Sequence, residues 1–383
     1  QCCFRRNTRA MTAPQISNRV HELRSNRGLS AAELAKHVGV SRQTIYAIEA
    51  GSYVPNTVTA LQMARVLQVS VEELFSLANR AGESADPVHA ELLCDSTDEV
   101  SDGQLVQLCR VGRSLVASAV PPMPAYLPDA DGLIEKKSKR GVSVQCAGGI
   151  PENGKRLLLA GCDPALSVLG TLVRPSGIDV VTVPCSSKKA LDWLARRRVH
   201  AAGSHLRDRH SGEYNVPFVK KLFPRRGIHV MTFAIWEQGL VVQRGNPKSI
   251  RAVADLAGKS ITIVNREKGS GSRDLLDSGL AHSSISGSTV QGYECIARGH
   301  LAAAYAVASD AADCCIATRS AARRFGLDFV PLAVERFDLS IDKDSLELPA
   351  MKALLDTLNR SMLRRKLETI AGYDATHTGD LLI

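Results

Sequence analysis

The chain has 383 residues, of which 44% are hydrophobic and 23% charged, a balance typical of a globular protein with two or three domains and not of a disordered one. Its net charge of +9 is compatible with a polyanionic partner but does not identify one. No apolar run approaches the roughly 20 residues of a membrane span, and we see no apolar signal-peptide core at the N-terminus. The ten cysteines include no CxxC pair, which favours reduced thiols in a cytoplasmic protein.

The first 79 residues are expected to comprise a short extension and a helical bundle. We predict a disordered extension over residues 1–14, because Met11 would be a sensible start of a coding sequence. From Ile16 to Leu77 the apolar residues recur at helical spacing in five short blocks, which predicts an all-α bundle over residues 15–79. Residues that favour the start of a helix precede or begin four of these blocks: Ser30, Ser41, Thr57 and Ser70.

The second and third blocks have the pattern of a helix-turn-helix unit. Ser30 is followed by Glu33 in the capping-box position, and Gly39 permits the left-handed turn that ends this helix. Ser41 then caps a third helix that runs to Ala50. Two short helices that meet at a glycine-containing turn are typical of this DNA-binding motif.

The segment "LSAAELAKHVGVSRQTIYAIEAG" resembles the phage-repressor-like (Xre/Cro) helix-turn-helix family over about 60 residues. In that family the third helix enters the major groove, where Arg can bond guanine and Gln can bond adenine through two hydrogen bonds. The family often has Gln where this chain has Ala31. The alternative is a helical interaction module that has lost DNA binding. The resemblance implies a double-stranded operator and these DNA-binding residues: Ser41, Arg42, Gln43, Thr44 and Tyr46.

Residues 80–141 are predicted to form a linker that contains one helix. Residues 80–100 are polar, and the Pro-rich segment that begins at residue 121 would stop any helix. Between them we predict a helix over residues 101–119, which would pack either on the following domain or on a second subunit. Its apolar side chains fall on one stripe: Leu105, Leu108, Val111, Leu115 and Val116.

From about Val142 onward, short β-branched or apolar runs alternate with helical stretches, which predicts an α/β fold with mainly parallel sheets. In such folds ligands bind at the carboxyl ends of strands, near helix N-termini. In "NREKGSGSRDLLD" the glycines free backbone N–H groups, the serines add donors, and Arg273 adds a positive charge. Such a turn suits an anion.

The motifs "GCDPAL", "AAGSHLRDRHSGEYNVP", "WEQGLVVQRGNP", "NREKGSGSRDLLD" and "GLDFVPLAVERFDL" resemble a periplasmic-binding-protein-like domain, similar to molybdate/tungstate-binding proteins, over residues 142–378. The resemblance implies a type II fold of two α/β lobes that close on a ligand, joined by crossovers at "WEQGLVVQRGNP" and "FVPLAVERFDLSI". Cys314 and Cys315 stand where the family usually has small residues. The resemblance implies these ligand-binding residues: Asp163, Ser187, His205, Ser270, Gly271, Ser272, Arg273 and His300.

Together these features predict a ligand-responsive transcription regulator that acts as a homodimer and is not an enzyme. The ligand is expected to be a small anion, with molybdate or tungstate as the first candidates. The alternatives are an organic ligand such as a pterin-type cofactor precursor, or a fused enzyme of molybdenum-cofactor assembly. We predict no catalytic residue, no cofactor and no metal site, since Cys162, Cys185 and His205 lack the spacing of a metal motif.

Overall fold

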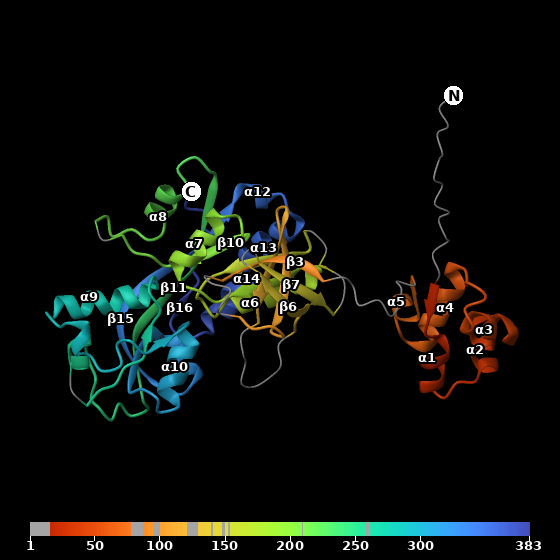
Figure 1. The fold of residues 1–383 in the computed structure, drawn as a ribbon, viewed down its shortest axis with the longest axis horizontal. Helices are drawn as coiled ribbons and strands as arrows, with labels where there is room; N and C mark the ends of the chain where they lie inside the picture. The colour runs from red at the N-terminus through yellow and green to blue at the C-terminus, as the bar shows by residue number, and fades with distance from the viewer. Residues whose placement is uncertain are drawn as a thin grey trace. The chain divides into compact units, whose positions relative to one another are not determined.

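The computed structural model describes residues 16–77, 87–94, 100–120, 129–138, 141–147, 150–151, 154–208, 210–257 and 260–383. The expected disorder of residues 1–14 lies outside these ranges. The chain divides into two compact units, Gln1–Asp86 and Pro87–Ile383 (Figure 1). Among the described residues, no helix has both the length and the apolarity that a membrane crossing requires.

The first unit is the predicted helical bundle, with a small two-stranded addition. Its helices are α1 (Val20–Asn26), α2 (Ala31–Val38), α3 (Arg42–Glu49), α4 (Thr57–Leu67) and α5 (Val71–Leu74), and β1 (Ile16–Asn18) pairs with β2 (Phe75–Leu77). Their buried faces share one core that includes Leu34, Ile45, Ile48, Met63 and Leu67.

The local signals explain where these helices begin and end. Ser30 and Glu33 form the predicted capping box, and Gly39 ends α2 with a φ of 73°. Ser41 caps α3 through a bond from the Thr44 N–H. The expected cap at Thr57 is wrong by one residue, because the Asn56 side chain accepts from the Thr59 N–H instead.

A closed five-stranded barrel begins the second unit, and it replaces the predicted linker helix. Its strands are β3 (Val88–Leu92), β4 (Leu105–Val111), β5 (Ser114–Ala119), β6 (Gly132–Ser138) and β7 (Gly141–Cys146). The helix over 101–119 is therefore wrong. Gly112, with a φ of 59°, and Arg113 form a two-residue hairpin turn between the paired residues Val111 and Ser114.

The barrel is joined to the following domain by apolar packing and by one arginine. Leu93, Cys109 and Val116 share a buried cluster with residues of that domain. Arg156, on the first strand after the barrel, donates to the Leu108 carbonyl over 2.9 Å and pairs with Asp131 and Asp179.

The remaining chain forms two α/β lobes around a seven-stranded sheet of order β14-β11-β15-β10-β8-β9, with β16 (Tyr373–Asp374) paired to β11. Strands β8 (Arg156–Ala160), β9 (Asp179–Val183) and β10 (Ala201–Ser204) are parallel. The sheet is nevertheless mixed, not mainly parallel, because β11 (Ile228–Val242) runs antiparallel to both β15 (Asp328–Asp342) and β14 (Cys314–Thr318).

The long strands β11 and β15 are the expected crossovers. Phe233 and Phe337, in their lobe-one halves, belong to one core cluster, whereas Leu240 and Val330 pack in a lobe-two cluster. Lobe one contains α6 (Leu166–Val173), α7 (Ser187–Ala195), α8 (Val216–Leu222), α12 (Lys343–Leu346), α13 (Pro349–Leu358) and α14 (Ser361–Glu368). Lobe two contains α9 (Gly271–His282), α10 (His300–Ala308), α11 (Arg319–Arg324), β12 (Asn265–Arg266) and β13 (Ile296–Ala297) (Figure 1). Within the described ranges there are also three short 3-10 helices: Arg174–Ser176, Val253–Ala257 and Gly287–Thr289.

Candidate functional site

Helix α3 presents the predicted DNA-contact residues on its solvent side. Ile45 and Ile48 are buried in the bundle core, whereas Arg42, Gln43 and Tyr46 are exposed. The Arg42 guanidinium donates to the Tyr46 hydroxyl over 2.8 Å and lies over its ring. The other two predicted residues are Ser41, which caps the helix, and Thr44, whose hydroxyl lies 2.8 Å from the Ser41 hydroxyl. Two side chains with base-reading chemistry therefore lie on the open face of α3.

The predicted ligand residues are brought to the junction of the two lobes. Asp163 follows β8 and His205 follows β10, while Ser187, Gly271 and His300 are the first residues of α7, α9 and α10. The His205 N–H donates to the Ser187 hydroxyl within lobe one. Across the lobes, a Cβ on Gly271 would lie only 2.4 Å from His205 Cε1. Only glycine permits this close approach of α9 to the imidazole.

His205 is held by a chain of hydrogen bonds that links both crossover strands. Its Nδ1 lies 2.6 Å from the Glu335 carboxylate, which also accepts from the Gln238 amide. The Ser272 hydroxyl donates to the same amide over 2.5 Å. Burial disfavours the charged imidazole, but negative charge on the Cys162 sulfur and on the Glu335 carboxylate outweighs this effect and raises the pKa of His205 to about 10. This shift favours the charged imidazole, which carries a proton on Nε2 as well as on Nδ1.

His300 has a proton on Nε2 for a different reason. Its Nδ1 lies 3.0 Å from Arg266 Nη1. Because a guanidinium can only donate, Nδ1 must accept, and the neutral ring carries its proton on Nε2. Burial, followed by the charges of Arg266 and His205, lowers the pKa of His300 well below its ordinary value. The ring is thus a neutral donor.

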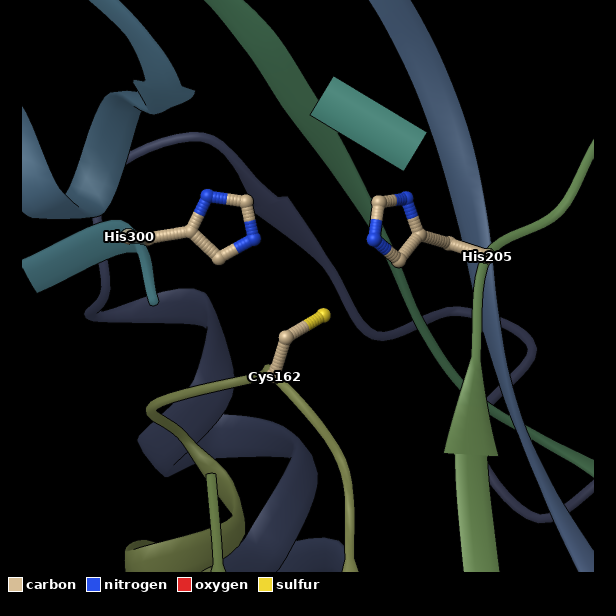
Figure 2. Close-up of side chains that lie close together, drawn as sticks. All are labelled: Cys162, His205 and His300. Carbon is tan, nitrogen blue, oxygen red and sulfur yellow. The ribbon is translucent and has the colours of Figure 1, made fainter. Parts of the chain in front are cut away.

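The two rings face a common point. Figure 2 shows a nitrogen of each ring directed at the other, with the Cys162 sulfur beside the space between them, and these three atoms lie within 4.8 Å of one another. Both Nε2 atoms are buried and have no hydrogen-bond partner among the described residues, as is also true of Trp236 Nε1. We call His205, His300 and Cys162 the donor cluster.

A cysteine and two histidines at this spacing are a ligand set that Zn²⁺ or copper could use. The hydrogen bond of His300 argues against that use here, because its tautomer places a proton, not a lone pair, at the shared point. The bond between Nδ1 of His205 and Glu335 does not distinguish the two uses, since a metal-bound imidazole is often held in the same way. The cluster therefore fits the acceptor atoms of a ligand better than a cation. It also differs from the trio considered from sequence, because Cys185 is not part of it.

Asp163 adds an acceptor beside the donor cluster. Its Oδ1 accepts from the Ala165 N–H and the Tyr373 hydroxyl, whereas Oδ2 has no partner among the described residues. Burial raises the pKa of Asp163 to about 6.

Two predicted residues make their contacts inside lobe two. Ser270 caps α9 and donates to the Glu267 carbonyl. Arg273 pairs with Asp277 over 3.2 Å and lies over the Tyr293 ring at 4.1 Å. A direct ligand contact by either residue stays a prediction.

Several residues of the site were not anticipated from the sequence. Trp236 packs edge-on against both His205 and His300, with ring centroids 5.2 Å apart in each pair, and Tyr373 lies 5.9 Å from it. Glu335 and Gln238 complete the set, whereas Cys162 was considered from the sequence only as a member of a metal trio. No alternation marked the strand residues, because the lobe-one halves of both crossovers are buried at nearly every position. The Cys314 and Cys315 side chains instead pack in the cores of lobe two.

Comparison with known proteins is consistent with this organisation. A helix-turn-helix domain model matches residues 15–77, and a PBP superfamily domain model matches residues 171–359. The chain is 42% identical over 62 residues to the uncharacterized HTH-type transcriptional regulator YgzD of Bacillus subtilis, which covers 16% of the chain and 94% of that protein. It is 37% identical over 179 residues to the uncharacterized protein YvgK of Bacillus subtilis, which covers 47% of the chain and only 58% of YvgK.

Among solved structures, the sulfate-binding protein SubI from Mycobacterium tuberculosis superposes with a TM-score of 0.42 at 18% identity, over 57% of this chain and 86% of SubI. This likeness is too distant to indicate a ligand.

Proposed function

We propose that this chain, which belongs to the helix-turn-helix transcriptional regulators and carries a ligand-binding PBP-superfamily domain, binds operator DNA under the control of a small anion held between its lobes. The observation that carries the ligand class is the pair of buried Nε2 atoms on His205 and His300, which have no hydrogen-bond partner in the described part of the chain.

Unpaired buried donors support a ligand with several acceptor oxygens. Each buried polar group without a partner costs about 1–3 kcal/mol, so a ligand that accepts from both rings would remove that cost. Three helices, α7, α9 and α10, begin at this place, and their N-terminal dipoles favour negative charge. The Glu335 carboxylate repels an anion less than an unpaired carboxylate would, because it pairs with the His205 imidazolium.

Molybdate and tungstate are the first ligands to test, because a tetrahedral oxyanion presents acceptors in several directions. An organic ligand such as a pterin is the second candidate. The observation that favours it is the free Oδ2 of Asp163 near aromatic side chains, since an acceptor beside rings would suit a planar ligand with N–H groups.

The experiment is a thermal-shift panel of molybdate, tungstate, sulfate, phosphate and a pterin on the full chain. A ligand bound only by the folded state stabilises it by RT ln(1 + [L]/Kd), about 2.7 kcal/mol at a hundredfold excess over Kd. We expect an oxyanion to raise the melting temperature of the wild type and to have little effect on His300→Ala, each compared with its own ligand-free protein. His282→Ala, on the exposed end of α9, is the matched control and should respond like the wild type.

If only the pterin raises the melting temperature, the ligand is organic and the anion proposal is wrong. If an oxyanion raises the melting temperature of His300→Ala as much as that of the wild type, the anion does not bind at the donor cluster.

A further inference from the structure

The positive charge of this chain is concentrated outside the helix-turn-helix unit. Residues 16–77 contain six Lys or Arg and five Asp or Glu, so the segment that carries α3 is nearly neutral, whereas the whole unit Gln1–Asp86 contains ten and seven. Residues 190–229, in lobe one, contain nine Lys or Arg and three Asp or Glu. A protein that holds DNA needs cations against the phosphates, and its recognition unit supplies few in excess.

The fold gathers many of these cations at one end of lobe one. Arg226 donates to the carbonyls of Leu194 and Ala195, which fixes the turn after α8 against the end of α7. The Lys343 N–H, at the start of α12, donates to the Gly227 carbonyl in the same turn. Figure 1 shows α7 and α8 together in lobe one. We call the exposed cations on these elements the basic surface: Arg196, Arg197, Lys220, Lys221, Arg225 and Lys343.

Ion pairs account for only part of the basic surface. Arg196 pairs with Asp192 over 3.1 Å, and Arg197 pairs with Asp344 over 2.9 Å. Lys220, Lys221 and Arg225 are exposed and have no acidic partner within the described ranges. Three neighbouring cations without counter-charges leave a positive potential that a solvated, internally paired face would not have.

We propose that the basic surface binds the phosphate backbone of double-stranded DNA beside the operator. The inference goes beyond ligand sensing and rests on the DNA binding proposed for α3. Both units belong to one chain, so binding of the first unit raises the effective concentration of phosphate near the second. Phosphate contacts add affinity without sequence preference, which complements base reading by Arg42 and Gln43. DNA is favoured over an acidic protein because the nearly neutral recognition unit leaves most phosphate neutralisation to other surfaces.

The test is the salt dependence of DNA binding by the full chain on a mixed-sequence duplex. Each phosphate contact contributes about −0.9 to the slope of log K against log salt. The triple variant Lys220→Gln, Lys221→Gln, Arg225→Gln should therefore have a slope shallower by roughly 2–3, with similar loss of affinity on every sequence. The matched control Arg251→Gln, Arg323→Gln, Arg324→Gln removes three exposed cations from lobe two and should leave the slope unchanged.

An unchanged slope in the lobe-one variant overturns the proposal and leaves an acidic protein as the partner. An equal change of the slope in both triple variants also overturns the proposal, because such a change would reflect only the lower net charge of the protein. The variant Arg42→Ala, Gln43→Ala separates this result from base reading, since it should reduce the preference for the operator while the slope on mixed-sequence DNA falls by no more than about 1. Absence of duplex binding by the wild type would refute both proposals.

Discussion

At the scale of single residues, hydrogen-bond partners decide what the site can bind. Cys162, His205 and His300 have side chains that bind soft metals, yet the guanidinium on Nδ1 of His300 makes its Nε2 a donor. Glu335 on Nδ1 of His205 favours the charged ring, in which Nε2 is a donor as well. The resemblance to periplasmic-binding-protein-like domains selected His205 and His300. It missed Glu335 and Arg266, which set their protonation, because those residues are respectively 130 and 34 positions away along the chain.

The charge of His205 gives a prediction for stability against pH. Its pKa is about 10 in the folded protein and near 6.5 when unfolded, so folding favours proton uptake between these values. The stabilising contribution is complete below about pH 6.5 and is lost as the pH rises through about 10. We expect the free energy of unfolding, measured by urea titration, to decrease between pH 7 and 10.

In Glu335→Gln this decrease should be smaller, because one of the two groups that favour the imidazolium, Cys162 and Glu335, is gone. His200 makes an internal comparison, since burial lowers its pKa to about 4 and it therefore acts only at acidic pH. An equal loss of stability in wild type and Glu335→Gln above pH 7 would show that this ion pair does not hold the proton.

At the scale of elements, local signals were reliable where they fixed both ends of a helix. Ser30, Gly39 and Ser41 mark α2 and α3 in the sequence and in the structure. The helix predicted over 101–119 was wrong because the apolar stripe of Leu105, Leu108, Val111 and Leu115 fits two short strands as well as it fits a helix. The decisive signal was Gly112-Arg113, which makes a hairpin turn, and the closing partners of the barrel are far away in sequence. Long-range strand pairing cannot be read from periodicity.

Helix α4 leads to a prediction about assembly. Val54 and the α4 residues Val58 and Leu61 are more than half exposed, and a groove beside them is lined by Ile16, Pro55 and Phe75. Exposed apolar patches of this kind are typical of interaction sites. We propose that this patch is the contact between two copies, whose α3 helices would read half-sites about 34 Å apart.

Val58→Asp should therefore convert a dimer into a monomer at micromolar concentration, as measured by light scattering, and weaken operator binding. Met362→Asp, at an exposed position of α14, is the matched control and should remain dimeric. A wild type that is monomeric with and without operator DNA would contradict the proposed contact.

At the scale of the whole molecule, the chain combines a helix-turn-helix unit with a two-lobed domain whose candidate site joins both lobes. The contact between Gly271 in lobe two and His205 in lobe one means that separation of the lobes would take apart the donor cluster. A ligand that bonds both rings therefore favours the closed arrangement, and any difference in DNA affinity between open and closed forms becomes a response to that ligand.

The most direct test is operator affinity of the full chain, measured with and without the oxyanion that raises its melting temperature. Allosteric coupling is typically 1–3 kcal/mol, so we predict a change in Kd of about 5- to 150-fold for the wild type and almost none for His300→Ala. The His282→Ala control should respond like the wild type. Equal operator affinity of the wild type in both conditions, at a ligand concentration that saturates the thermal shift, would contradict control of DNA binding by this site.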